Sequence, residues 1–275
     1  MTAPRPHYLV CPPSFYQVAY TINAWMRPEV WRANEGYWTA RSREQWRALT
    51  DAMRRLDWGL KTVEPRPDLP DMVFTANHAL VIGRRALVAR FVKPERQGET
   101  EHARRWLADE GFEARVCPTA FEGAGDALYD AASDVIFMGH GFRSSPEAAL
   151  DLADFFGKKV VPLRLRDPRF YHLDTCLCPL AGGRALFTPL AFTAEGQEVL
   201  RRHYGEGLIE IPDDDALRFG CNAVNFGRDV VLPTVGEATT AALRERGFTP
   251  HLVELDSFLL AGGASRCLTL RLDET

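Results

Sequence analysis

The chain has 275 residues, of which 46% are hydrophobic and 11% aromatic, enough for a large core in one or two domains. Its basic and acidic residues are dispersed and give a net charge of −4, so no basic face for nucleic acid is predicted. No apolar run approaches the roughly 20 residues that span a bilayer, and no export signal is visible at the N-terminus. We therefore expect a cytoplasmic protein that binds neither membranes nor nucleic acid.

Similar units follow one another along the chain, and each consists of a predicted hairpin, a helix and a short returning strand. The predicted helices cover residues 42–56, 101–110, 146–156, 195–203 and 237–246. The returning strands, β-rich and bounded by Gly or Pro, cover residues 60–65, 113–118, 158–163, 207–212 and 250–255. No Ser/Gly-rich or charged linker separates the units, so residues 1–275 are predicted to form a single domain. The opening segment, residues 11–38, has little periodicity and suits a lid or pocket wall as well as a surface loop.

A recurrence of about 48 residues places a polar or reactive side chain at the same point of every unit, which is typical of a repeat architecture. The marked residues are Asn77, Asp126, Asp174, Asn222 and Cys267, at intervals of 49, 48, 48 and 45 residues. Units that cannot bury both faces alone should stack around an axis, with first strands inside and helices outside. The fold class predicted is therefore α/β, a five-bladed propeller of pseudo-fivefold ββαβ repeats. An ordinary doubly wound sheet is the alternative, but it predicts no such period.

The ends of the chain are expected to complete one blade together. The opening strand, residues 7–13, has no preceding helix, and the closing strand, residues 267–272, has no following one. Pairing between them would close the ring and remove exposed sheet edges. The marked side chains would then converge on one axial pit.

Candidate reactive groups lie at these marked positions or within four residues of them. Cys267 follows a turn of small residues, where a thiol is accessible to a ligand, although a buried core cysteine is the alternative. His172 and Asp174 are two apart, so on a strand they would share one face. Glu122 and Asp126 lie on a Gly-rich turn, an unfavourable place for two carboxylates unless a cation or donor faces them. Packing alone explains such a set poorly.

The other cysteines show no zinc-like spacing. Cys176 and Cys178 are predicted to be small core residues on one face of a strand rather than metal ligands. We expect no metal and no organic cofactor, because a thiol and an imidazole supply the chemistry considered below.

The sequence resembles the guanidine-modifying enzymes of the pentein superfamily, which includes arginine deiminases, dimethylargininases and amidinotransferases. Segments that carry the resemblance include LPDMVFTAN, ARFVKPERQGE, FEGAGDAL, DPRFYHLDTCLCPLA and LAGGASRCLTLRL, and together the matches cover nearly the whole chain. The set is most similar to the arginine dihydrolase module, with bacterial dimethylargininases next. This resemblance implies the same five-bladed α/β propeller.

The resemblance also implies residue roles. Cys267 would be the nucleophile, His172 the general acid and base, and Glu122 the group that orients His172. Residues expected to bind substrate are Asn23, Asn77, Arg90, Asp126, Arg143 and Asp174, although Asp126 could instead support the turn of the second blade. Within this set, Arg90 and Arg143 would grip the substrate carboxylate and Asp174 the guanidinium nitrogens. A surface ion pair is the alternative for each of the two arginines.

The function favoured is hydrolysis of arginine to ornithine, ammonia and carbon dioxide through a covalent S-alkylthiouronium on Cys267. Arginine deiminases place a carboxylate where this chain has Asn77, and a neutral amide suits a ureido group, which motivates a second hydrolytic cycle on citrulline. The alternatives are dimethylarginine hydrolysis, arginine deimination, amidinotransfer, and a non-catalytic propeller that only binds. The expected partner is a small guanidino compound such as arginine, and a homo-oligomer is left open.

Overall fold

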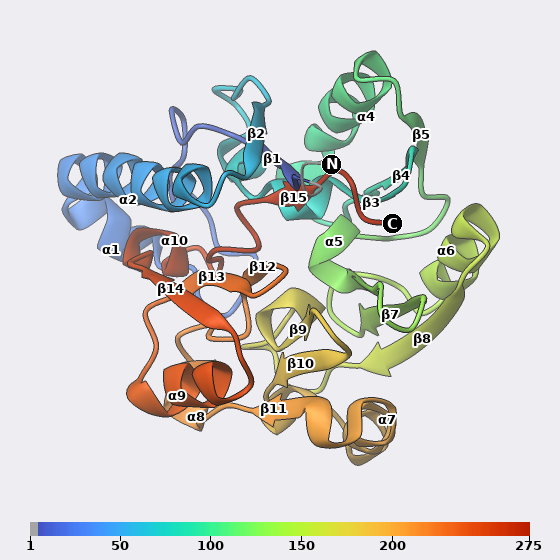
Figure 1. The fold of residues 1–275 in the computed structure, drawn as a ribbon. Helices are drawn as coiled ribbons and strands as arrows, with labels where there is room; N and C mark the ends of the chain where they lie inside the picture. The colour runs from blue at the N-terminus through green and yellow to red at the C-terminus, as the bar shows by residue number, and fades with distance from the viewer. Residues whose placement is uncertain (1–4) are drawn as a thin grey trace.

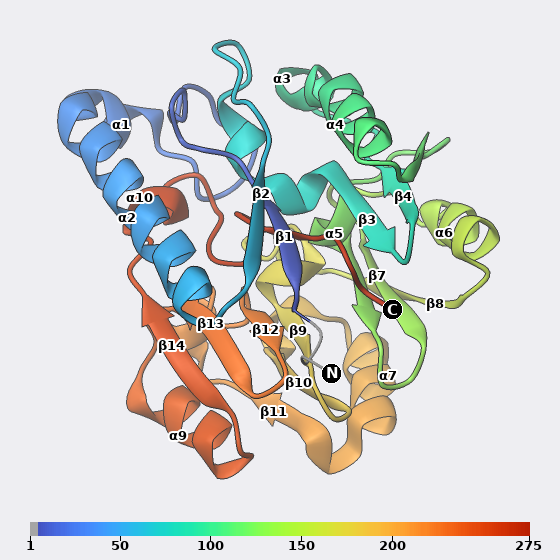
Figure 2. The ribbon, with the colours of Figure 1, turned by 45° about the horizontal axis from the view of Figure 1, so that its top comes forward.

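The structure is a computed structural model that describes residues 5–275, and its strands form five small sheets around a common axis (Figures 1 and 2). Each sheet has three strands. The strands are β1 (His7–Val10), β2 (Gly59–Thr62), β3 (Ala79–Ile82), β4 (Arg85–Val88), β5 (Glu113–Val116), β6 (Ala127–Asp130), β7 (Val135–His140), β8 (Lys159–Arg164), β9 (Leu177–Leu180), β10 (Arg184–Phe187), β11 (Leu208–Glu210), β12 (Val224–Phe226), β13 (Asp229–Pro233), β14 (Thr249–Val253) and β15 (Leu270–Arg271).

Every sheet has the same topology, because its first two strands pair antiparallel and its second and third strands pair parallel. In the sheet of β15, β1 and β2, the closing strand pairs with the opening one, with Tyr8 opposite Arg271. The predicted shared blade and the five-bladed α/β propeller are thereby confirmed. Five separate sheets replace the single sheet of the doubly wound alternative.

The longer helices lie on the outside of the ring (Figure 1). The α-helices are α1 (Pro28–Ala33), α2 (Glu35–Arg55), α3 (Pro94–Gln97), α4 (Glu99–Asp109), α5 (Gly123–Asp126), α6 (Ala148–Phe156), α7 (Ala194–Tyr204), α8 (Asp213–Ala216), α9 (Glu237–Glu245) and α10 (Asp256–Leu259). All five predicted helices are present. The first of them, α2, begins seven residues before the expected start at Ser42, because α1 and α2 occupy the end of the segment that showed little periodicity. No helix in the described part of the chain is both long and apolar enough to cross a membrane.

Burial explains why inner and returning strands differ in their pattern of apolar residues. All four residues of the inner strand β3, and all four of β6, are buried, as expected for strands covered on both faces. The returning strand β5 instead alternates exposed and partly buried residues, because only one of its faces is covered. The pattern of apolar residues along a strand therefore distinguishes the inner strands, which face the axis, from the returning strands.

The marked residues lie just before the inner strands, and Cys267, expected to begin the closing strand, lies three residues before β15. Three of them lie in η2 (Thr75–His78), α5 and η3 (Leu173–Thr175). Asn222 directly follows a turn before β12, and Cys267 lies in a turn before β15. The prediction that His172 and Asp174 share one face of a strand is therefore wrong, since His172 is an extended residue that directly precedes η3. The side chains of Asn77, Asp126 and Asn222 bond backbone groups of neighbouring turns, and such local bonds compete with strand pairing.

Candidate functional site

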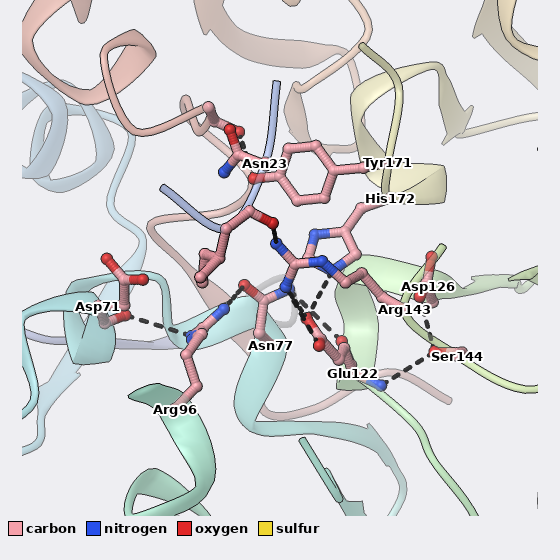
Figure 3. Close-up of polar contacts among 12 residues, drawn as sticks. Asn23, Asp71, Asn77, Arg96, Glu122, Asp126, Arg143, Ser144, Tyr171 and His172 are labelled. Carbon is pink, nitrogen blue, oxygen red and sulfur yellow. Dashed lines mark hydrogen bonds and ion pairs between the residues drawn. The ribbon is translucent and has the colours of Figure 1, made fainter. Parts of the chain in front are cut away.

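A buried carboxylate, Glu122, holds two other candidate residues together (Figure 3). Its Oε2 lies 2.8 Å from His172 Nε2, and Arg143 Nη1 donates to both Glu122 oxygens at 3.0 and 3.2 Å. Glu122 precedes α5, His172 precedes η3, and Arg143 follows β7, so three turns converge here. Burial alone would raise the pKa of Glu122, but the charge of Arg143 and the hydrogen bond with His172 outweigh it and hold that pKa below its usual range.

Because an ionised Glu122 can only accept, His172 Nε2 must carry the proton in this contact. His172 Nδ1 is buried and has no hydrogen-bond partner in the described chain. This nitrogen lies close above Gly125, where an added Cβ would be 3.3 Å away. With Nε2 bonded to Glu122, the ring keeps Nδ1 free to exchange a proton with a bound molecule.

Asp126 connects the turn of Glu122 to the turn of His172. Its Oδ2 accepts from Ser144 Oγ at 2.6 Å, and its Oδ1 accepts from Leu173 N at 3.2 Å. Ser144 Oγ also accepts from Glu122 N at 3.0 Å. Burial raises the pKa of Asp126 to about 6, against the opposing charge of His172. Both carboxylate oxygens of Asp126 bond protein groups, which favours its predicted role in supporting the turn over substrate contact.

Cys267, Asp174 and Asn222 form the second part of the site. Cys267 Sγ donates to Asp174 Oδ2 at 3.2 Å and accepts from Asn222 Nδ2 at 3.1 Å. Asn222 Oδ1 accepts from the backbone N–H of Cys267 at 3.2 Å, so a single amide holds both the thiol and its turn. Only 2% of Cys267 is exposed, and Asp174 is fully buried.

No cation contacts the carboxylate of Asp174 or the thiol of Cys267 among the described residues. Burial raises the pKa of Asp174 to about 7, and burial together with the Asp174 charge raises the pKa of the Cys267 thiol well above its usual value. Asp174 Oδ1 has no hydrogen-bond partner among the described residues. A buried carboxylate with a free oxygen next to a neutral thiol is poised to accept a cation.

Asn77 lies beside Glu122 and His172, and its orientation is set by a buried arginine (Figure 3). Arg96 Nη1 donates to Asn77 Oδ1 at 2.8 Å, while its other nitrogens hold Glu99 in a two-point pair at 2.8 Å each. Since the amide oxygen faces Arg96, Asn77 Nδ2 points to the Glu122 carbonyl at 3.4 Å. The same nitrogen lies over Gly125, where a Cβ would be only 2.1 Å away.

Asn23 and Arg90 occupy different environments. Asn23 Nδ2 donates to Ala261 O at 2.9 Å, so Asn23 ties the opening segment to the turn before Cys267. Arg90 is exposed, and its Nε donates to Cys117 O at 2.7 Å. The substrate-binding roles of both residues stay predictions. Arg143, by contrast, makes a buried ion pair rather than the surface pair of the alternative.

Asp71, Arg96 and Asn222 belong to this network but were not predicted as site residues. Asp71 O accepts from Arg96 at 3.3 Å, and Asp71 Oδ2 accepts from Tyr20 at 3.0 Å. The sequence did contain signals for them, because Asn222 occupies a marked position and the other two lie in segments that carry the family resemblance. Cys176 and Cys178, predicted to be core residues, are fully buried in the core.

The family profile described as "N,N dimethylarginine dimethylhydrolase, eukaryotic" matches residues 12–273. The chain belongs to this family. The match covers the turns that carry Cys267, His172 and Glu122, and it confirms the resemblance to the pentein enzymes.

The relatives include two kinds of enzyme. The chain is 40% identical to the bifunctional arginine dihydrolase/ornithine cyclodeaminase ArgZ of Synechocystis over 97% of its own length and 37% of ArgZ, and so spans well under half of that relative. It is 37% identical to an N(G),N(G)-dimethylarginine dimethylaminohydrolase of Mycobacterium tuberculosis, over 96% of this chain and 85% of that protein.

Solved structures of the ArgZ N-terminal domain align over 98% of both chains with a TM-score of 0.91 and 39% identity. One is a cysteine-to-serine variant bound to substrate. Another, an asparagine-to-serine variant, is covalently bonded to a reaction intermediate.

Because Arg143 and Glu122 form a buried ion pair, we expect removal of Arg143 to lower the stability of the fold strongly. Arg143→Met leaves the Glu122 carboxylate buried with one cation fewer, which should lower the free energy of unfolding by about 3–5 kcal/mol. Denaturant unfolding measures this, with Arg104→Met as the control because Arg104 pairs with Glu101 on the exposed face of α4. Adding Glu122→Gln to Arg143→Met should restore part of the loss. Equal effects for Arg143→Met and Arg104→Met would contradict the assignment.

Proposed function

We propose that the chain is an arginine dihydrolase that converts arginine to ornithine, ammonia and carbon dioxide in one five-bladed domain. The observation that carries the proposal is the hydrogen bond from Cys267 Sγ to Asp174, whose second oxygen is free. Asp174 is two residues along the chain from His172, which pairs with Glu122. The family and the ArgZ relative support the substrate class.

Binding of a guanidinium supplies the positive charge that Asp174 lacks. A planar guanidinium donates two parallel hydrogen bonds to a carboxylate, so Asp174 Oδ1 is a suitable acceptor. Once Asp174 is paired, its charge no longer raises the pKa of the Cys267 thiol, and the cation itself favours a thiolate. The nucleophile is thus activated by its own substrate, with Asn222 Nδ2 donating to the sulfur.

In the first cycle Cys267 passes its thiol proton to His172 Nδ1, and the resulting thiolate adds to the guanidinium carbon. His172 gives a proton to the leaving nitrogen, and ammonia departs, which leaves a covalent S-alkylthiouronium. Neutral His172 then takes a proton from water as the water attacks the same carbon. Collapse of this adduct breaks the C–S bond, releases citrulline and regenerates the thiolate. Glu122 stabilises the imidazolium form of His172 before ammonia departs and again after water has given up its proton.

In the second cycle the thiolate adds to the ureido carbon of citrulline, and a second ammonia departs to leave a thiocarbamate. Water cleaves the C–S bond and yields the carbamate of ornithine, which loses carbon dioxide. Asn77 is suited to this cycle because Arg96 holds its oxygen and leaves Nδ2 as the donor. An amide N–H can bond a ureido oxygen, whereas a guanidinium has only donors.

Arg96 and Arg143 are proposed to bind the substrate carboxylate, because both are buried cations beside Asn77 and Glu122. Arg90 remains the other predicted candidate, although its side chain is exposed. The cytoplasmic location and a homo-oligomer also remain expectations.

Dimethylarginine is the second candidate substrate, favoured by the family match and the mycobacterial relative. Its methyl groups require a slightly larger pocket, a difference of roughly 1–3 kcal/mol in binding. Steady-state assays with arginine and dimethylarginine side by side separate the two candidates.

Mass spectrometry of products from isotopically labelled arginine tests the proposal. We expect ornithine and two equivalents of ammonia, without accumulation of citrulline. Cys267→Ser should abolish turnover, since the hydroxyl is a far weaker nucleophile, while the control Cys178→Ser in the core should remain active. Citrulline as the only product would exclude the second cycle, and turnover by Cys267→Ser would exclude covalent catalysis.

Asn77→Asp should convert the enzyme into one that stops at citrulline. The new carboxylate can pair with Arg96 and a guanidinium but cannot donate to a ureido oxygen. Product ratios at matched turnover measure the change, and Asn34→Asp, at an exposed helix end, is the control. An unchanged yield of ornithine from Asn77→Asp would show that the amide donor is not needed.

A further inference from the structure

A cavity of about 440 Å³ lies at the opposite end of the inner strands from the candidate active site. The candidate site gathers residues from the turns that precede the inner strands, whereas this cavity is lined by residues at and beyond their far ends, including Asp130, Leu180 and Phe226. The inner strand β9 contacts both β6 and β12, and β1, β9 and β12 lie near the centre of the ring (Figure 2). The cavity is therefore an axial feature built by several blades.

Arg266, which directly precedes Cys267, forms part of the wall of this cavity. Its side chain is only 11% exposed, and within residues 5–275 its one ion contact is Glu274, at 3.9 Å. The buried Nε has no hydrogen-bond partner in the described chain. A buried guanidinium carries five N–H donors that need acceptors. Arg266 thus offers donors that the surrounding protein does not use.

The remaining walls restrict the kind of ligand. Arg271 adds a second cation, which lies over the rings of Tyr8 and Phe226 at 5.4 and 5.0 Å. On the hairpin side the wall is largely apolar and consists of Ala131, Ala132, Pro179, Leu180 and Ala181. Acidic side chains balance part of this charge, because Glu274 also lines the cavity and contacts Arg266, and Asp273 pairs with Arg271. Asp130 is already bonded to Ala132 N, Ser133 Oγ and His203 Nε2. The cavity thus combines cationic donors at one end with space for a small apolar body.

We propose that this cavity is a second ligand site, which binds a small organic monocarboxylate with its carboxylate on Arg266 and its apolar body against the hairpin turns. A guanidinium matches a carboxylate in a two-point, charge-assisted pair. The cavity volume lies within the range of small-molecule sites. This site is separate from the one at which arginine is proposed to react.

The position of Arg266 connects the two sites physically. Its backbone N–H donates to Asn222 Oδ1 at 3.0 Å, the same oxygen that accepts from Cys267 N. Asn222 also donates to the Cys267 thiol. A ligand that binds Arg266 and shifts its position would therefore act one residue from the nucleophile.

Calorimetric titration of the Cys267→Ser protein with benzoate tests the proposal, with benzamide as the uncharged compound of the same shape. We expect saturable binding of benzoate with a Kd of about millimolar order, and binding of benzamide at least about tenfold weaker. Arg266→Met should weaken benzoate binding by at least about tenfold as well. Arg228→Met, which removes an exposed arginine next to the cavity rim, is the matched control and should bind normally.

Repeating the titration with the catalytic site saturated by arginine distinguishes the two sites, and benzoate binding should persist. Absence of saturable binding, equal binding of benzamide, displacement by arginine, or no effect of Arg266→Met would each overturn the proposal. The comparison of benzoate with benzamide needs no further variant, so it decides the question even if Arg266→Met does not fold.

Discussion

The site depends on how buried carboxylates around the propeller axis are neutralised. Glu122 and Glu99 each have an arginine in direct contact, and in both cases the pKa is held below its usual range despite burial. Asp174 has no cation in contact among the described residues, and its pKa is raised to about 7. Glu122 and Glu99 are therefore ionised and paired within the protein, whereas Asp174 can bind a cation from outside it. In the proposed reaction a guanidinium substrate completes the charge balance, and the thiol beside Asp174 becomes reactive only then.

The fold makes this arrangement possible because each blade contributes one turn to the axis. A residue in a single turn before an inner strand points across the axis instead of taking part in a strand ladder. Glu122, His172 and Cys267 come from positions far apart in sequence, yet each is held by a side chain of another turn. Glu122 and His172 hold each other, and Asn222 holds Cys267. Closure of the ring by β15 and β1 holds Cys267, which lies just before β15, in register with the other blades. Rigid blades thus position groups that loops alone would leave mobile.

Much of the fold and part of the site could be predicted from the sequence. The period of about 48 residues requires equivalent units, so five blades and the convergence of Asn77, Asp126, Asp174, Asn222 and Cys267 followed from spacing. The local conformation did not, because a polar residue before an apolar strand is equally compatible with the strand start and with a preceding turn. For this reason His172 and Asp174 were placed on a strand. Arg96 was missed because its environment depends on Glu99 and Asn77 meeting in space, while Arg90, nearby in sequence, is exposed.

The measurement that tests the central claim most directly is arginine binding to the Cys267→Ser protein as a function of pH. If Asp174 must be ionised to bind the guanidinium, affinity should rise with pH up to about 7 and then level off, with a change of up to about tenfold per pH unit below that value. Asp174→Asn should bind more weakly and lose this dependence. An affinity that is the same from acidic to neutral pH, or a dependence that survives in Asp174→Asn, would contradict the account.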